Sequence, residues 1–266
     1  MRVRAPATSA NLGPGFDAAA VALDLWNEVE VGEGGEPDRE HLGVRAFALL
    51  SDPAGRSFSF TDRIPRERGL GSSAAVIALG LVAGSIADGV EPSVDELLAL
   101  GLELEGHPDN LAAALAGGVT AVVDGRVTRL ADSAPAEAIA VVPQTTVNTE
   151  AARAALPETV PHRDAAYTAG HALLLGAALT SRSAHLFAAA AHDRLHEPYR
   201  AKTAPLLGAV RAERPAGALA VTLSGSGPTV IVWAAPGDAE RCADELAARF
   251  EDADVLRLPT TPSGAA

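Results

Sequence analysis

A run of glycines and serines ahead of an apolar segment is the first place where this chain could do chemistry. The run reads Pro65-Arg66-Glu67-Arg68-Gly69-Leu70-Gly71-Ser72-Ser73-Ala74-Ala75. Its glycines allow backbone conformations that a Cβ atom would forbid, and they let an anion come close to the chain. Ser72 or Ser73 can cap a helix predicted over residues 74–87, so that free N–H groups and the positive dipole end face the loop. Such a loop is suited to cradle a phosphate group.

The spacing within this run separates it from other phosphate loops. No Gly-Lys-Ser/Thr closes it as in a Walker loop, and the G-x-G-x-x-G spacing of a dinucleotide-binding turn is absent. An ordinary Gly/Ser turn before a helix is the simplest alternative, and the short G-x-G-S-S element alone would favour it. The full string is more specific: it resembles the ATP-phosphate loop of the GHMP kinases, the family of galactokinase, homoserine kinase, mevalonate kinase and phosphomevalonate kinase. The resemblance implies ATP as a ligand of residues 65–75.

A second Gly/Pro-rich string lies near the N-terminus. It reads Ala7-Thr8-Ser9-Ala10-Asn11-Leu12-Gly13-Pro14-Gly15-Phe16-Asp17 and predicts a rigid turn that ends on a carboxylate. Taken alone, it is compatible with a tight surface turn in which Asp17 caps the following apolar stretch. The string resembles the first motif of homoserine kinases, in which an Asn and an Asp contact the amino-acid substrate. The resemblance implies that role for Asn11 and Asp17.

A third string breaks the chain between two predicted helices. It reads Glu105-Gly106-His107-Pro108-Asp109-Asn110. Asp109 is predicted to cap a helix over residues 110–116, and His107 is otherwise a plain loop residue. The string again resembles homoserine kinases, where the His and the Asn reach the substrate, whereas mevalonate kinase-like members carry a longer turn. The resemblance implies that His107 and Asn110 are site residues. It also implies a Mg²⁺ site on Ser73 and Glu105, with Glu103 as the weaker alternative, and one Glu with one Ser suits Mg²⁺ bound to phosphates.

Two arginines complete the set of candidate residues. Residues 148–157 resemble the T-x-x-A-R-x-x-L-P string of the family, which implies that Thr149 and Arg153 line the substrate site. The alternative is a solvated helix face with Thr149 as its cap. Residues 193–200 resemble the D-R-L-H-x-P-Y-R string of bacterial homoserine kinases, which implies a second carboxylate-binding arginine at Arg200. A guanidinium fork matches a planar carboxylate better than a lysine does.

Local patterns predict the elements that must position these residues. Ser93 and Glu96 form a capping box at the start of a helix running to about residue 105, and Asp124-Gly125 is a hairpin turn between two strands. A strand, the Gly-rich turn Ser224-Gly225-Ser226-Gly227-Pro228 and a second strand resemble the third GHMP motif, a loop that packs over the phosphate loop. Further strands are predicted over residues 2–5, 29–31, 57–61, 138–142 and 255–258, and helices over 41–50, 164–180, 183–195 and 238–250. Residues 260–266 are predicted to be a disordered tail.

Composition restricts the class of protein. The chain has 266 residues, 48% of them hydrophobic, which allows one large or two small domains. A formal net charge of −13 argues against nucleic acid or an anionic membrane as the main partner. Cys242 is the only cysteine, which leaves no intrachain disulfide. Without a signal core or a long apolar run, we expect a soluble cytoplasmic protein.

The resemblance implies an α+β fold of two domains. Residues 1–145 are expected to form an N-terminal ATP-binding domain resembling ribosomal protein S5 domain 2, and residues 146–266 a ferredoxin-like C-terminal domain. The implied activity is that of a homoserine kinase, which uses ATP and Mg²⁺ to make O-phospho-L-homoserine for threonine biosynthesis. Two alternatives stay open: a mevalonate-type small-alcohol kinase, and a catalytically silent ligand-binding regulator. Two features keep the silent regulator open: the chain has His41-Leu42 where the family carries Asn-Leu, and its segment 31–64 is short. Among partners we expect L-homoserine and ATP, and a homodimer stays open.

Overall fold

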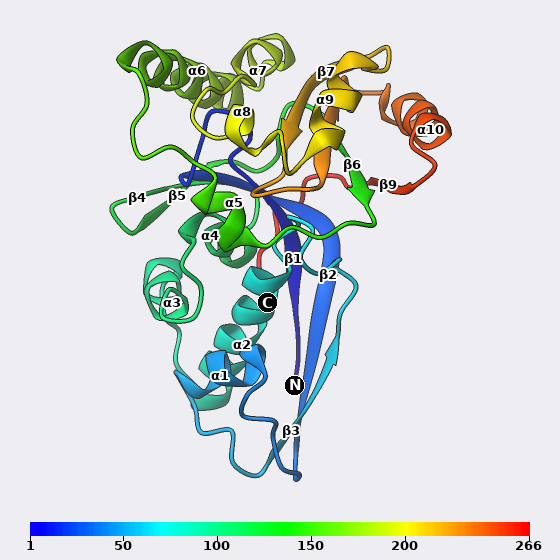
Figure 1. Cartoon of the computed structure of the whole chain (residues 1–266). Coiled ribbons are helices and arrows are strands. Elements are labelled where there is room, and N and C mark those ends of the chain that lie inside the picture. Colours follow the sequence, from blue (N-terminus) through cyan, green and yellow to red (C-terminus); the bar gives the residue numbers. More distant parts are fainter.

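Two antiparallel sheets organise the chain in the computed structural model, which describes residues 1–266 (Figure 1). The first sheet has the order β1-β2-β4-β5, and β3 pairs with β2. Its strands are β1 (Arg2–Ala10), β2 (Ala19–Glu33), β3 (Arg56–Thr61), β4 (Val119–Val123) and β5 (Arg126–Ala131). The helices of this half are α1 (Leu42–Ala48), α2 (Ser72–Asp88), α3 (Val94–Gly101) and α4 (Pro108–Ala116).

The second sheet has the order β7-β8-β6-β9. Its strands are β6 (Glu137–Pro143), β7 (Ala218–Leu223), β8 (Val230–Ala234) and β9 (Ala253–Arg257). Its helices are α5 (Thr149–Ala154), α6 (His162–Ser181), α7 (Ala184–Ala190), α8 (Glu197–Arg200), α9 (Pro205–Ala212) and α10 (Ala239–Arg249). Helices between β6 and β7, the β7-β8 pair and α10 before β9 give the ferredoxin-like arrangement that the sequence predicted. β5 belongs to the first sheet and β6 pairs only within the second sheet. The chain therefore passes from one sheet to the other between β5 and β6, which is before the domain boundary predicted after residue 145.

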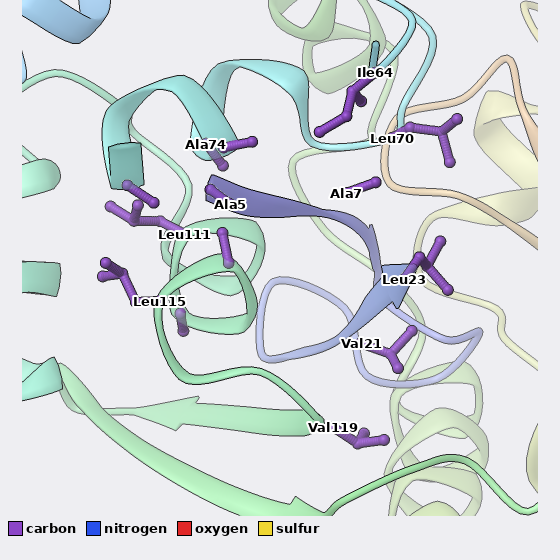
Figure 2. Close-up of a cluster of buried hydrophobic side chains, with 14 of the residues drawn as sticks. Ala5, Ala7, Val21, Leu23, Ile64, Leu70, Ala74, Leu111, Leu115 and Val119 are labelled. Carbon is purple, nitrogen blue, oxygen red and sulfur yellow. The ribbon is translucent and has the colours of Figure 1, made fainter. Parts of the chain in front are cut away.

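The core of the first half fixes the two helices that lead into the site. Ala74, in the first turn of α2, lies beside Ala5 of β1, and Leu70 and Leu111 of α4 belong to the same buried cluster (Figure 2). Each fully buried leucine contributes about 1.5–3 kcal/mol relative to an exposed one. The cluster therefore holds the N-terminal ends of α2 and α4 against β1, where the sequence placed its phosphate loop and its third string.

Two predicted turns and caps are confirmed. Ser93 Oγ accepts the N–H of Glu96 at 3.3 Å while the Glu96 carboxylate accepts the N–H of Ser93 at 2.7 Å, which is a capping box at the start of α3. Asp124 and Gly125 both have positive φ, +50° and +74°, as a type I′ hairpin turn between β4 and β5 requires. Both signals are local, so neighbours in the sequence suffice to produce them.

Two predicted helices end earlier than expected. The helix that follows the capping box ends at Gly101 instead of running to about residue 105. The helix predicted over residues 183–195 ends at Ala190, and a separate short helix, α8, begins at Glu197. The buried Asp193 carboxylate accepts the N–H groups of Leu195, His196 and Glu197 at 2.8–2.9 Å, which holds this stretch in a turn instead.

The prediction of a disordered tail was wrong. Residues 260–266 pair with the first sheet: Thr261 N donates to Ala22 O at 3.0 Å, and Arg4 and Ala266 exchange two backbone hydrogen bonds of 2.9 and 3.1 Å. Gly117, with φ +69°, lies so close to this segment that a Cβ would come within 2.4 Å of Pro262 O. The tail therefore ties β9 of the second sheet to β1, β2 and the end of α4. None of the helices is both long and apolar enough to cross a bilayer.

Candidate active site

A cavity of about 780 Å³ brings the candidate residues from all of these strings together. It is lined by these predicted residues: Asn11, Asp17, Pro65, Glu67, Gly69, Gly71, Ser72, Ser73, Ala74, Glu105, His107, Asn110, Thr149, Arg153 and Arg200. Four predicted residues of the phosphate loop do not line it: Arg66, Arg68, Leu70 and Ala75. Leu70 and Ala75 are buried in the core, so they position the loop from behind.

Free backbone N–H groups make the loop before α2 an anion cradle. The N-cap of α2 is Gly71, with φ +66° and no side-chain cap, so the predicted capping by Ser72 or Ser73 was wrong. Both serines lie inside the first turn of the helix. No N–H from Gly69 to Ala74 donates to another group of the protein, and Ala75 N is the first to do so, to Gly71 O at 2.9 Å. A phosphate oxygen fits this set of donors at the positive end of the helix dipole.

Close packing, in addition to positive φ, requires glycine at two positions of the loop. A Cβ on Gly69 would lie 2.4 Å from Ser224 O, and a Cβ on Gly71 would lie 1.8 Å from Thr8 Oγ1. Ser224 Oγ also donates to Gly69 O at 2.6 Å. The loop of residues 224–228 therefore packs against the phosphate loop, as the sequence predicted.

Neither arginine of the loop is directed at the cavity. Arg68 donates to Pro143 O at 3.0 Å and to Gln144 O at 2.9 Å, while Arg66 pairs with Asp62. Arg68 thus clamps the loop to the end of β6. The positive potential of the cradle comes from backbone N–H groups and the helix dipole, not from these side chains.

The N-terminal turn is held by its own asparagine. Asn11 is buried, with φ +72°; its Oδ1 accepts the N–H of Asp17 at 3.0 Å, and its Nδ2 donates to Gly225 O at 3.1 Å. Asn11 therefore joins the turn to the loop of residues 224–228 and directs Asp17 into the cavity. The role of substrate contact that the resemblance implied for Asn11 stays a prediction.

Asp17 and Arg153 form an ion pair across the cavity. Arg153 Nη2 donates to Asp17 Oδ1 at 2.8 Å and Oδ2 at 2.7 Å, and it lies 3.1 Å from His107 Nδ1. The Arg153 and Asp17 side chains are 42% and 35% exposed, so water screens the pair and it contributes about 1 kcal/mol at most. A ligand that carries both charges can therefore replace it.

Asp109 was predicted as a helix cap and is instead a buried residue of the site. Helix α4 begins two residues earlier than predicted, at Pro108, with His107 at the N-cap. The Asp109 side chain accepts the N–H of Asn110 at 2.7 Å and lines the cavity. Burial raises the pKa of Asp109 to about 6; the N–H of Asn110 opposes this rise and the charge of Asp17 adds to it. The only sequence signal was a carboxylate between His107 and Asn110, which capping explained equally well.

Thr8 is a second residue that the sequence reasoning missed. Its Oγ1 donates to Asn110 Oδ1 at 2.7 Å, next to Gly71. Because Asn110 is a predicted substrate residue and Gly71 is the cap of the phosphate helix, Thr8 connects the two ends of the site. No local pattern marks this contact, which joins residues separated by more than a hundred positions.

Arg200 has guanidinium nitrogens without a partner in the protein. Only 3% of the residue is exposed, and burial lowers the pKa of Arg200 from its usual value. Its Nη1 donates to Gly225 O at 3.1 Å, whereas its buried Nε has no partner in the protein, and Nη2 donates to no protein group. Nη2 is therefore the guanidinium nitrogen that can donate to a ligand in the cavity, and a guanidinium is suited to an anionic group such as a carboxylate.

The metal residues that the resemblance implied are compatible with one ion shared with a nucleotide. Glu105, Ser72 and Ser73 all line the cavity, whereas Glu103 is exposed outside it. No group of three or more His, Cys, Asp or Glu side chains could enclose a metal. Mg²⁺ does not need such a cage, because it is held by one or two protein oxygens together with phosphates and water.

Comparison with known proteins identifies the same family that the sequence motifs resemble. The models "GHMP kinases N terminal domain" and "GHMP kinases C terminal" match residues 41–118 and 172–252. The homoserine kinase of Streptomyces avermitilis is 43% identical, over 91% of this chain and 88% of that protein. The homoserine kinase of Gloeobacter violaceus is 38% identical, over 99% of this chain and 97% of that protein.

Solved structures show the same fold. The crystal structure of homoserine kinase from Cytophaga hutchinsonii has a TM-score of 0.90 at 27% identity, and the match covers 100% of this chain and 96% of that one. A mevalonate kinase structure, with a TM-score of 0.76, covers 98% of this chain and 99% of that one, but at 16% identity it shows the fold alone. On identity and coverage together, the chain belongs to the homoserine kinases of the GHMP kinase family.

Proposed function

We propose that this chain transfers the γ-phosphoryl group of ATP to the side-chain hydroxyl of L-homoserine, giving O-phospho-L-homoserine for threonine biosynthesis. The observation that carries the substrate assignment is the guanidinium of Arg200, whose Nη2 donates to no protein group, in the same cavity as Asp17. A guanidinium and a carboxylate across one cavity complement a zwitterion. Homoserine has an α-carboxylate and an α-ammonium at one end and the reacting hydroxyl at the other.

The protein would bind the triphosphate mainly through backbone N–H groups. The N–H groups of residues 69–74 have no partner in the protein, and all of these residues except Leu70 line the cavity at the start of α2. Phosphoryl transfer depends on in-line positioning and on neutralising charge more than on covalent help from the protein. The cradle supplies both, because its donors are fixed by the core beneath Leu70 and Ala74.

At the opposite end, the amino acid would replace an existing ion pair. The substrate carboxylate binds Arg200 Nη2 and Arg153, and the ammonium binds Asp17 once Arg153 has moved to the carboxylate. His107 and Asn110, at the start of α4, lie between this end and the phosphate loop, where they can position the hydroxyl. This division of roles accounts for the contact between Arg153, Asp17 and His107 in the protein without ligand.

Ser73 and Glu105 fit the role of magnesium ligands. Both line the cavity beside the N–H groups of the cradle. When bound there, Mg²⁺ would neutralise charge on the phosphate oxygens. Ser73 projects from the first turn of α2, and the Glu105 carboxylate faces the same cavity from the start of the third string.

An activity panel tests the substrate assignment. ATP-dependent phosphorylation is measured with L-homoserine, L-serine, mevalonate and galactose, using purified protein and Mg²⁺. We expect L-homoserine to have the highest kcat/KM, since mevalonate lacks an ammonium for Asp17 and serine is one methylene shorter. Preference for mevalonate would contradict the proposal, and binding of ATP without turnover of any alcohol would instead support a silent regulator.

A further inference from the structure

His196 lies completely buried behind Arg200 and contacts both halves of the molecule. Its Nε2 is 2.8 Å from Gly13 O in the N-terminal turn, and its Nδ1 is 3.4 Å from Arg200 Nη1, one helical turn ahead in α8. The residue is 0% exposed. The Asp193 carboxylate fixes its backbone by accepting the N–H of His196 at 2.8 Å.

The partners of His196 allow one tautomer. A carbonyl oxygen only accepts, so Nε2 must carry the proton that it donates to Gly13 O. A guanidinium only donates, so Nδ1 must offer its lone pair to Arg200. The neutral Nε2–H form meets both requirements, whereas the opposite tautomer or the imidazolium would place two donors against each other at Arg200.

The same contacts determine which edge of Arg200 is free. Its Nη1 is held between His196 Nδ1 and Gly225 O, the carbonyl that Asn11 Nδ2 also binds. Phe16 stacks on the His196 ring at 5.1 Å between centroids and lies 5.4 Å from the Arg200 guanidinium. With Nη1 occupied, Nε buried and the ring covering one side, Nη2 is the nitrogen left for a ligand.

We propose that His196 is a positioning residue that orients Arg200 toward the substrate carboxylate and couples that orientation to the turn carrying Asp17. This inference rests on the proposed function, because the carboxylate is that of the amino acid. Its contacts include no group of the phosphate cradle, so its effect is specific to one end of the substrate. Loss of the contact leaves ATP binding unchanged and weakens the amino acid.

A pair of substitutions separates the two contacts of the ring. In His196→Asn, the amide oxygen can replace Nδ1 and still accept from Arg200, but it cannot reach Gly13. In His196→Gln, the amide nitrogen can replace Nε2 and donate to Gly13 O, but no acceptor remains for Arg200. We expect about a tenfold rise in KM for homoserine with Gln, a rise of about threefold or less with Asn, and an unchanged KM for ATP in both. His192→Gln is the control, since His192 is partly exposed and has no contact with Arg200.

An analogue shows whether the effect passes through the carboxylate. 3-Aminopropan-1-ol is homoserine without its carboxylate, so His196→Gln should leave its kcat/KM unchanged. Equal losses for homoserine and this analogue, or a parallel rise in KM for ATP, would overturn the proposal. If no alcohol is phosphorylated by the unmodified protein, the proposed function has failed, and calorimetric binding of homoserine and ATP to the same variants still tests the positioning role.

Nitrogen NMR of the unmodified protein provides a test that needs no variant to fold. The imidazole assigned through its contact with Phe16 should show a protonated Nε2 and an unprotonated Nδ1. The opposite tautomer would refute the positioning of Arg200 by His196.

Discussion

Replacing Asp17 with asparagine should have opposite effects on two substrates that differ only by an amine. L-Homoserine carries an ammonium that Asp17 would bind, and 4-hydroxybutyrate has the same length, hydroxyl and carboxylate but no amine. In the protein without ligand, Asp17 is bound to Arg153 by two contacts of 2.8 and 2.7 Å. Asp17→Asn therefore removes both the ammonium contact and the competing ion pair.

The structure indicates the size of both interactions. A charge-assisted hydrogen bond to the ammonium contributes about 1.5–3 kcal/mol. The ion pair with Arg153 is about one-third exposed or more on both sides, so opening it costs only about 0.5–1 kcal/mol. For homoserine the variant loses the ammonium contact but no longer has to open the ion pair, a net loss of about 1–2 kcal/mol or about 5- to 30-fold in kcat/KM. For 4-hydroxybutyrate only the ion pair is lost, so kcat/KM should rise about two- to fivefold.

Steady-state kinetics with a coupled assay for ADP measures both substrates under identical conditions. Asp24→Asn serves as the matched control, because Asp24 is an exposed residue of β2 outside the cavity. An equal fall in kcat for both substrates would refute the reasoning, since it would mean that Asp17 acts on the reacting hydroxyl. An unchanged kcat/KM for homoserine would place the ammonium elsewhere in the cavity.

Three further variants test other parts of the site. Glu105→Gln should lower kcat at least about a hundredfold without unfolding the protein, as judged by circular dichroism, while Glu103→Gln stays active; the reverse result would transfer the metal role to Glu103. Gly71→Val should abolish calorimetric ATP binding and also weaken homoserine, because its Cβ would displace the Thr8 hydroxyl that holds Asn110, and unchanged nucleotide affinity would contradict this. The pKa of Asp109 is raised from 3.8, its ordinary value in an unfolded chain, to about 6 in the folded protein. The ionised carboxylate therefore destabilises the fold by about 3 kcal/mol above pH 6, and this effect is small below pH 3.8. In urea unfolding, its replacement by Asn should therefore be stabilising at pH 8 and nearly neutral at pH 4, and equal effects at both pH values would contradict the assigned cause.

Features determined by neighbouring residues were predictable from the sequence. The capping box at Ser93 and the hairpin turn at Asp124-Gly125 depend on side chains and φ angles within four positions. The loop of residues 224–228 was expected against the phosphate loop because its string resembles a family motif. In each of these cases the signal is short and its partner is either local or fixed by the motif.

Features determined by tertiary packing were not predictable. Serines such as Ser72 and Ser73 are typical N-cap residues, but Gly71 is the N-cap of α2. Thr8 of β1 fills the space that a side chain at position 71 would need, so only glycine fits there. The tail beyond residue 259 has the composition of a disordered end, yet β1 and α4 offer it unpaired backbone groups. Asp109 has the sequence signal of a cap, and only the three-dimensional burial of its carboxyl identifies it as a residue of the site.

The charge balance of the cavity explains why packing matters so much to this site. The chain carries a net charge of −13, and its single lysine, Lys202, is exposed away from the cavity. Arg66 and Arg68 are bound to other groups, so no cationic side chain of the loop faces a triphosphate. The loop itself can then recognise the phosphates only through the geometry of its backbone N–H groups, and that geometry is set by glycines, Thr8 and the core beneath α2. A substitution that shifts this backbone by a fraction of an ångström should therefore cost more ATP affinity than removal of any one charged side chain of the loop.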